Sequence, residues 1–408
     1  MMRRVVITGL GAITPIGNNV SDYFDSLSKG VVGIAPITKF DPSDLKVKIA
    51  AEVKNFDPSL YMDVPEIKKL DLYSQYAIAS AHQAVSDSKI MDNINPHRFG
   101  VYMGSGIGGI DIFKTEAIKQ HEGGSSKVSA NFIPMTIINI ASGLIAIRYK
   151  AQGPNMAIVT ACATGASCIG EAYHTIMLGK ADAMIAGGSE AAVNKLSIAG
   201  FQNMFALTRR NDPLCASIPF DKRRDGFVLG EGSGALILEE LEHAKKRGAK
   251  IYAEIVGYGN TCDAHHVTAP VPDGNGAARA LLIASETLKS NDNVYINAHG
   301  TSTPFNDKTE TTAIKSAFGD RAEKIAISST KSMTGHTLGA AGAIESIASI
   351  MAINKGIVPP TMGYLEKDDE CDLDYVPNKA RKTDIDFALS SSFGFGGQNA
   401  VLGFRKYK

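Results

Sequence analysis

Residues 160–165, TACATG, and residues 330–335, TKSMTG, carry the same T-x-x-x-T-G spacing 170 residues apart. Each copy lies between an apolar stretch typical of a buried strand and a helix-like segment rich in small residues. A second echo occurs in the same order, since Val101-Tyr102 precedes MGSG and Val294-Tyr295 precedes INAHG. Two echoes in one order predict a duplicated α/β unit, in which helices cover both faces of mostly parallel sheets.

The chain of 408 residues is too long for one simple core, which agrees with a fold built from two units. We place the division near residue 250, so that residues 1–250 carry the first copy of the motif and residues 251–408 the second. No Pro- or Ser-rich linker separates the two, and we therefore expect them to share one continuous interface.

Composition and charge exclude several classes of protein. Lys plus Arg equals Asp plus Glu, 42 each, so no overall field favours nucleic acid or an anionic membrane. Gly and Pro interrupt both the N-terminal MMRRVVITGLGAITPIG and the apolar region 132–147, and we expect neither a signal peptide nor a membrane span. Five irregularly spaced cysteines predict no disulfide framework and no zinc site, and favour a cytoplasmic location.

Cys162 is the first candidate for chemistry, because its neighbours in AIVTACATGAS (157–167) are small residues instead of the Leu, Val or Phe that pack around a structural thiol. A strand-turn-helix segment exposes a nucleophile at its turn, and small neighbours leave room for a bulky substrate. The partial positive charge of the helix N-terminus is expected to favour the thiolate. We expect the other four cysteines to be structural.

Two histidines, a lysine and a glycine-rich loop accompany this thiol. His299 follows an apolar strand in NVYINAHGT, and His336 lies in the second motif copy, five residues after Lys331. Both histidines come at strand ends beside Gly, where α/β folds place their chemistry. In SSFGFGGQNA (391–400), the glycines around Phe395 allow the backbone to approach a ligand closely. The DAHH segment (263–266) lacks a clear third ligand, so no metal site is expected.

Four motifs then carry a resemblance to a known family: TACATGA, NAHGTSTP, STKSMTGHTLGAAGA and SFGFGG. Together they resemble the condensing enzymes of fatty-acid synthesis, the elongating type II β-ketoacyl-[acyl carrier protein] synthases. The resemblance runs from VVITGLGAITPIG to AVLGFRKY, which is essentially the whole chain. It implies the thiolase fold, a duplicated α/β/α layered unit, and a homodimer.

The resemblance also implies an activity: an acyltransferase that carries out the decarboxylative Claisen condensation of malonyl-acyl carrier protein with a Cys-bound acyl chain, giving 3-oxoacyl-acyl carrier protein. Cys162 matches the nucleophile, and His299 and His336 match the pair that promotes decarboxylation and stabilises the enolate. Lys331 matches the lysine that tunes this site. The backbone N–H groups of Cys162 and Phe395 match the oxyanion hole, with the Phe395 ring as a gate.

The remaining implied residues support or bind the substrate. Glu345 matches a buried acid near the histidines, where some relatives hold a structural cation that we do not expect here. The family needs no cofactor of its own, because the phosphopantetheine arm arrives on the acyl carrier protein. The substrate-binding residues implied are Ile107, Phe132, Phe201, Thr268, Thr301 and Thr303.

The chain departs from the family pattern at two positions. Ala269 stands where a hydroxyl is frequent, and Phe205 stands where a basic, carrier-docking residue is found. Acyl carrier proteins are acidic and this chain is neutral overall, so docking is expected to use local charges. The candidates are Lys68, Lys69, Lys127, Arg209 and Arg210.

Four alternatives compete with this interpretation. An initiating synthase pairs Cys and His with Asn, and a thiolase uses a second cysteine, whereas TGHTLGAAG carries a histidine. A non-catalytic chain-length factor lacks the thiol that Cys162 supplies. A Cys/His hydrolase needs a polar route for water, whereas GSGIGGI (104–110) and GFQNMF (200–205) indicate an apolar acyl pocket.

Overall fold

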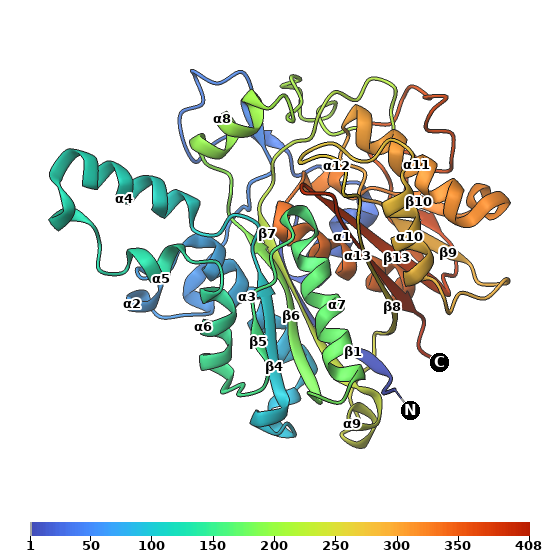
Figure 1. Cartoon of the computed structure of the whole chain (residues 1–408), viewed down its shortest axis with the longest axis horizontal. Coiled ribbons are helices and arrows are strands. Elements are labelled where there is room, and N and C mark those ends of the chain that lie inside the picture. Colours follow the sequence, from blue (N-terminus) through green and yellow to red (C-terminus); the bar gives the residue numbers. More distant parts are fainter. Residues whose placement is uncertain (1) are drawn as a thin grey trace.

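The computed structural model of the chain describes residues 2–408, and a mixed sheet of ten strands runs through it (Figure 1). From one edge to the other the strands are β10 (Ala326–Ser328), β9 (Val294–Asn297), β13 (Phe387–Gly394), β14 (Gln398–Arg405), β8 (Ala253–Cys262), β1 (Val5–Ile13), β7 (Gly232–Glu240), β6 (Ala183–Glu190), β4 (Phe99–Gly104) and β5 (Asn155–Met156). Two short pairs lie apart, β2 (Ala35–Pro36) with β3 (Ile49–Ala50) and β11 (Ile357–Val358) with β12 (Arg381–Lys382).

The sheet has the same order of pairings when it is followed inward from either edge. On one side β4 is parallel to β5 and β6, β6 is antiparallel to β7, and β7 is antiparallel to β1. On the other side β9 is parallel to β10 and β13, β13 is antiparallel to β14, and β14 is antiparallel to β8. The two series meet where β1 and β8 pair antiparallel. The duplicated α/β unit predicted from the repeated motif is confirmed, while the division near residue 250 stays a prediction.

Helices form layers around and between the two series of strands. α3 (Leu72–Ser88) packs on β1, β7 and β6, and α6 (Ile140–Tyr149) packs on β4. In the equivalent place on the other side, α10 (Asn275–Ala284) packs on β8 and β14, and α11 (Pro304–Phe318) packs on α10. α7 (Thr164–Met177) and α13 (Ala341–Lys355) pack on each other and contact strands of both series. These two helices follow the two copies of the motif and form the central layer.

Small residues allow this central layer to form. All residues of α13 from Ala341 to Ile353 are buried, and the apolar faces of α7 and α13 share one core with β1, β6, β7, β8 and β14. A Cβ at Gly165 would lie 2.8 Å from the backbone N of Ala343, and a Cβ at Gly342 would lie 2.6 Å from that of Ala166. Glycine at both positions is therefore what lets the two helices approach closely.

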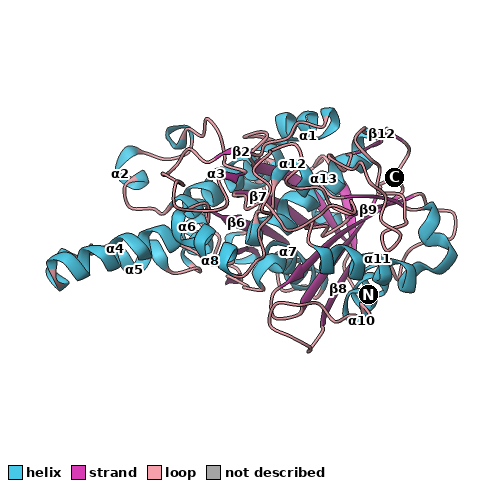
Figure 2. Cartoon of the chain, turned by 90° about the horizontal axis from the view of Figure 1, so that it is seen from above, coloured by secondary structure: helices cyan, strands magenta, loops and turns pink. Residues whose placement is uncertain are grey.

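The remaining helices lie at the periphery or in connections: α1 (Val20–Lys29), α2 (Val64–Ile67), α4 (Ile110–Gly123), α5 (Phe132–Thr136), α8 (Lys195–Asn203), α9 (Leu241–Lys246) and α12 (Lys331–Thr334). α4 and α5 extend from the body of the molecule as an arm (Figure 2). Over residues 2–408, no helix combines the length and the apolar character needed to cross a membrane.

Candidate active site

Cys162 lies in a short 3-10 turn, Ala161–Ala163, directly before the N-terminus of α7. The side chain is buried, and Ala161 adopts a left-handed backbone conformation with φ of 48°. The loop at the end of β13 packs against this turn so tightly that a Cβ on Gly394 would lie 2.5 Å from the carbonyl oxygen of Thr160. Glycine at position 394 is therefore what lets this loop approach the turn that carries Cys162.

The turn opens onto a cavity of about 420 Å³. The residues that line this cavity come from segments far apart in the chain, and they include both aromatic rings and hydroxyl groups. Eight of the twelve predicted site residues line it: Cys162, Phe201, Thr268, His299, Thr301, Thr303, His336 and Phe395. The structure therefore brings the thiol, both histidines and most of the substrate-binding residues together.

The two histidines lie side by side in this wall, with ring centroids 5.3 Å apart and ring planes nearly perpendicular. Both are buried, and Nδ1 of each ring has no hydrogen-bond partner among the described residues. Burial, and then the Lys331 ammonium, lower the pKa of both His299 and His336 well below the ordinary value. At neutral pH each imidazole is uncharged, and each ring carries one N–H that can donate to a ligand.

Lys331 and Glu345 form a buried ion pair next to the histidines, with Nζ and Oε1 2.5 Å apart. Burial raises the pKa of Glu345 to about 7, although Lys331 acts in the opposite direction. The second carboxylate oxygen, Oε2, is buried with no partner among residues 2–408. The pair supplies a cation close to the cavity without exposing it to water.

The surroundings of the Cys162 thiol correct one expectation. The helix N-terminus was expected to favour the thiolate, but burial raises the pKa of this thiol to about 12. The Lys331 ammonium and the backbone N–H groups of Phe395 and Cys162 oppose that effect without overcoming it. In the resting site the thiol therefore keeps its proton, because desolvation outweighs the favourable dipoles and charge.

The backbone N–H groups of Cys162 and Phe395 both lower the pKa of the Cys162 thiol, so both act on this sulfur. The hydroxyl oxygens of Thr301 and Thr303 lie 2.9 Å apart and face the same cavity. The Phe393 ring packs against His299 at 5.5 Å between centroids. The site thus combines a buried thiol, two backbone N–H groups that act on it, and two uncharged imidazoles.

Four predicted site residues do not line the cavity. Lys331 and Glu345 lie behind the histidines, and Ile107 belongs to the same apolar cluster as Cys162 and Phe201. Phe132 lies at the start of α5 on the arm, where its ring packs on that of Phe113, and it is not part of the cavity wall of a single chain.

Two buried carboxylates that sequence reasoning missed hold the catalytic segments in place. Glu310 accepts hydrogen bonds from the backbone N–H groups of His299 and Gly300, each at 2.8 Å, and burial raises its pKa to about 7. Glu190 accepts bonds from four donors, which are Ser105 Oγ (2.7 Å) and the backbone N–H groups of Gly106 (2.8 Å), Ile107 (3.2 Å) and Gly339 (3.0 Å). Glu190 could have been noticed in the sequence, because it is an acidic residue at the end of the apolar strand ADAMIAGGSE. No sequence pattern pointed to Glu310.

The expectation of no metal site stays a prediction. Among residues 2–408 no group of three or more His, Cys, Asp or Glu side chains is arranged to hold a metal ion. Of the basic residues considered for docking, Arg209 and Arg210 lie next to Asp225 at the cavity, while Lys68, Lys69 and Lys127 are exposed near the arm.

Comparison with known proteins agrees with this geometry. Residues 2–244 match the family described as "Beta-ketoacyl synthase, N-terminal domain", and residues 252–365 match "Beta-ketoacyl synthase, C-terminal domain". The chain is 54% identical to 3-oxoacyl-[acyl-carrier-protein] synthase 2 of Synechocystis sp. and 49% identical to that of Staphylococcus aureus. In both cases the similarity covers 100% of this chain and 99% of the relative.

Solved structures show the same relationship. One solved structure, of a type II PKS acyl-carrier protein in complex with its ketosynthase, contains a chain that matches this one with a TM-score of 0.93 at 35% identity. The match covers 100% of this chain and 100% of that chain. A β-ketoacyl synthase from Burkholderia phymatum gives a TM-score of 0.93 at 34% identity, again over 100% of both chains. The fold is the thiolase fold that the resemblance implied, and the chain belongs to the β-ketoacyl synthase family.

Proposed function

We propose that this chain catalyses the decarboxylative Claisen condensation of malonyl-acyl carrier protein with an acyl chain held on Cys162, giving 3-oxoacyl-acyl carrier protein in fatty-acid elongation. The observation that carries the proposal is the convergence of Cys162, His299 and His336 on one cavity, which Phe395 also lines. The names of the relatives, 3-oxoacyl-[acyl-carrier-protein] synthase 2, support the same acyltransferase reaction.

In the first half-reaction the Cys162 sulfur attacks the acyl thioester carbonyl. The developing oxyanion accepts hydrogen bonds from the N–H groups of Cys162 and Phe395, and its collapse expels the carrier's thiol, which takes up the proton lost by Cys162. A thiol with a raised pKa needs help to lose that proton, and the uncharged imidazoles beside it are the available bases.

In the second half-reaction the malonyl carboxylate leaves as CO₂ and its electron pair moves onto the thioester oxygen as an enolate. His299 and His336 donate N–H groups to that oxygen, which is the point where charge develops. The enolate carbon then attacks the acyl group on Cys162, and the sulfur leaves as thiolate. Lys331, paired with Glu345, supports the negative charge from behind the histidines.

The acyl carrier protein is the partner in this proposal, and its phosphopantetheine arm is the only prosthetic group involved. Thr301, Thr303 and Thr268 line the route by which the arm reaches Cys162, and Phe201 with Ile107 borders the acyl chain. A carrier complex of a related ketosynthase supports this partner. We also propose that the Phe395 ring acts as a gate, because the glycine-rich loop that carries it allows the ring to move.

A homodimer and a cytoplasmic location belong to the same proposal. Large apolar side chains are exposed along the arm and the β5 edge, including Ile133, Ile147 and Met156, and a second copy of the chain would cover them. Phe132 would reach a cavity only across such an interface. The five cysteines are free thiols, as a reducing compartment allows.

The test is to mix the protein with malonyl-carrier and a ladder of acyl-carriers and to read the product masses. A product heavier than the acyl-carrier by two carbons and one keto oxygen is expected, and Cys162→Ala should abolish it. Release of free fatty acid in place of that product would contradict condensation and indicate a hydrolase.

A further inference from the structure

Ser302 holds an unusual backbone conformation between the two threonines that face the cavity. Its φ is 67°, in the left-handed region, and the residue is fully buried. A residue with a Cβ is strained there and persists only where its surroundings hold it. The conformation of Ser302 sets the directions of Thr301 and Thr303, so whatever holds Ser302 also positions their hydroxyl groups.

The segment of residues 218–226 holds Ser302 from both sides. The N–H of Ile218 donates to Ser302 Oγ at 2.9 Å, and the N–H of Gly226 donates to the Ser302 carbonyl at 3.0 Å. The same segment reaches the first turn of α11, because the N–H of Phe220 donates to Asp307 Oδ2 at 2.8 Å. Ser302 thus depends on the shape of a turn more than 75 residues earlier in the chain.

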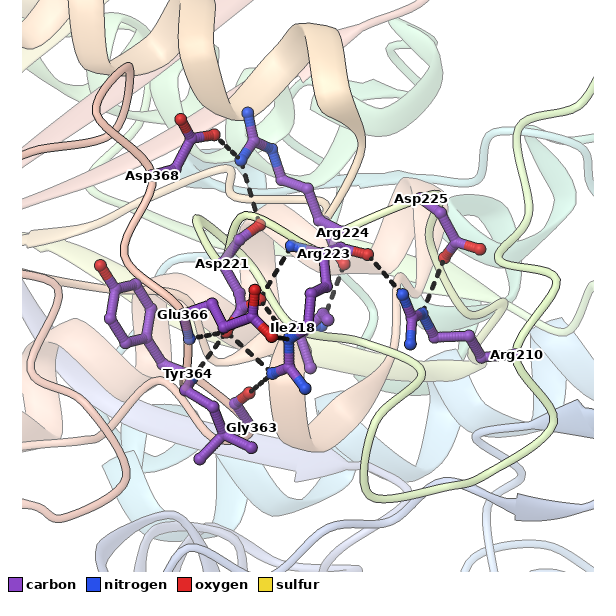
Figure 3. Close-up of polar contacts among 12 residues, drawn as sticks. Arg210, Ile218, Asp221, Arg223, Arg224, Asp225, Gly363, Tyr364, Glu366 and Asp368 are labelled. Atoms are coloured by element: carbon purple, nitrogen blue, oxygen red, sulfur yellow. Dashed lines mark hydrogen bonds and ion pairs between the residues drawn. The ribbon is translucent and has the colours of Figure 1, made fainter.

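Arg224 fixes the shape of that turn (Figure 3). One guanidinium nitrogen donates to the Asp221 carbonyl at 3.1 Å and to Asp368 Oδ2 at 2.5 Å. The other donates to the carbonyl of Pro304, the first residue of α11, at 3.2 Å. One side chain, 4% exposed, therefore joins the 218–226 turn, the start of α11 and the loop that carries Asp368.

Charge and donor geometry together make this junction specific for arginine. Asp307 is fully buried and lies 3.9 Å from Arg224 Nε, and Asp368 lies on the other side of the same guanidinium. A lysine ammonium would keep the positive charge, but its donors all leave from one nitrogen, so it cannot reproduce the bonds that Arg224 makes from two separate guanidinium nitrogens. The neighbouring Arg223 points elsewhere and pairs with Asp221 and Glu366.

We propose that Arg224 is a positioning residue that holds Thr301 and Thr303, through Ser302, in the geometry that receives the phosphopantetheine arm of the carrier. This role rests on the proposed function, since the arm is the ligand of that site. Arg224 itself touches neither substrate nor the reacting atoms.

The test compares Arg224→Lys with Arg247→Lys. Arg247 is a matched control, because it is equally buried and forms a two-pronged ion pair with Glu239 at the end of α9, outside the cavity wall. Two quantities are measured in each variant: the hydrogen exchange of a peptide covering residues 299–307, and KM and kcat with malonyl-carrier and with the malonyl thioester of ethanethiol, which has no arm.

Arg224→Lys should speed exchange in the 299–307 peptide and raise KM for malonyl-carrier by about tenfold, the effect of losing one or two hydrogen bonds. The KM for the ethanethiol ester and both kcat values should stay within about twofold of the unaltered chain. Arg247→Lys should change neither quantity. If Arg224→Lys does not fold, Asp368→Asn removes one anchor of the guanidinium and should shift both quantities in the same direction by less.

Unchanged exchange in the 299–307 peptide would overturn the positioning role. Faster exchange with an equal rise in KM for both thioesters would overturn the link to the arm. Failure of the unaltered protein to use malonyl-carrier would contradict the proposed function instead, and the exchange measurement, which needs no substrate, would still decide whether Arg224 holds Ser302.

Discussion

At the scale of single residues, opposing electrostatic effects meet at the sulfur of Cys162. Burial favours the neutral thiol, whereas Lys331 and the N–H groups of Phe395 and Cys162 favour negative charge. In the proposed reaction these donors would act on the negative charge that forms during acyl transfer and thiolate release. The site therefore stabilises charge that appears in the reaction more than charge in the resting protein.

The reactivity of Cys162 should show its raised pKa directly. We expect labelling by iodoacetamide to keep rising about tenfold per pH unit up to pH 10, because the thiolate fraction grows in that way below the pKa. Peptide mass spectrometry between pH 6.5 and 10 measures this, with free glutathione in the same buffer as the reference. The exposed Cys262 should label first at pH 7. A plateau for Cys162 below pH 8 would show instead that the helix N-terminus and Lys331 dominate.

The histidines should matter more for decarboxylation than for acyl transfer. His299→Ala or His336→Ala removes one donor to the enolate oxygen and should slow CO₂ release from malonyl-carrier by about 10²–10³. Acylation of Cys162, seen as a mass shift with acyl-carrier alone, should fall less. His97→Ala, an exposed histidine, serves as the control. Equal losses in both half-reactions would contradict this division of roles.

The same histidines predict a pH profile. Their pKa values are lowered, so both rings stay neutral as the pH falls from 7 to 6, and the rate of decarboxylation should stay nearly constant over that range. A stopped CO₂-release assay at several pH values measures this. A decline centred near pH 6.5, the ordinary histidine value, would contradict it.

At the scale of elements, Glu190 at the end of β6 joins two segments that border the thiol. It accepts bonds from the loop after β4, through Ile107, and from Gly339 in the turn between His336 and α13. A Cβ on Gly339 would lie 2.4 Å from the N of Gly106, so the two segments touch backbone to backbone. The wall near Ile107 is therefore rigid, and a larger side chain there cannot be absorbed by moving the loop.

Ile107→Phe should shorten the acyl chains that the protein accepts. Ile107 packs in one cluster with Cys162 and Phe201, and a bulkier ring there would fill space behind the thiol. We expect turnover of long acyl-carriers to fall at least tenfold while short ones stay usable, read from product masses across a chain-length ladder. Ile283→Phe, an exposed position on α10 away from the arm, is the control. An unchanged product profile would remove Ile107 from the acyl pocket.

At the scale of the whole molecule, a single chain leaves apolar surface uncovered. β5 is an edge strand with Met156 exposed, Ile147 on α6 is 78% exposed, and the arm carries Phe113, Ile118 and Ile133 at its surface. An edge strand and a set of large apolar side chains together are features of an interface between copies of a chain.

Ile147→Glu combined with Met156→Glu should therefore convert a homodimer into monomers, because two buried charges per subunit would be left without partners. Analytical ultracentrifugation measures the change, and far-UV circular dichroism checks that the fold is kept. We also expect condensation to fall, since Phe132 lies outside the cavity of its own chain. The same double change at exposed Leu60 and Leu178 is the control. A dimer that survives the change would place the interface on another face.

The sequence by itself determined the duplicated α/β fold and supplied the candidates for the reactive groups. The T-x-x-x-T-G copies precede the two central helices, α7 and α13, and Cys162, His299 and His336 were all assigned to the site in advance. Such assignments are local: a small-residue turn, a strand end or a glycine-rich loop leaves its mark within about ten residues. That is why Cys162, His299, His336 and Phe395, which the structure brings to one cavity, could be named as candidates without coordinates.

Only the tertiary structure decided how these groups behave. The raised pKa of Cys162 comes from burial in a cluster whose members run from Ile34 to Leu338, which no local pattern records. Glu190, Glu310 and Arg224 act on backbone groups of distant segments, and a lone acidic or basic residue in a sequence does not reveal its partner. Phe132 lies on the arm, outside the cavity of its own chain, because the fold places α5 at the periphery. Burial and distance between remote segments are properties of the packed chain, so they appear only once it has folded.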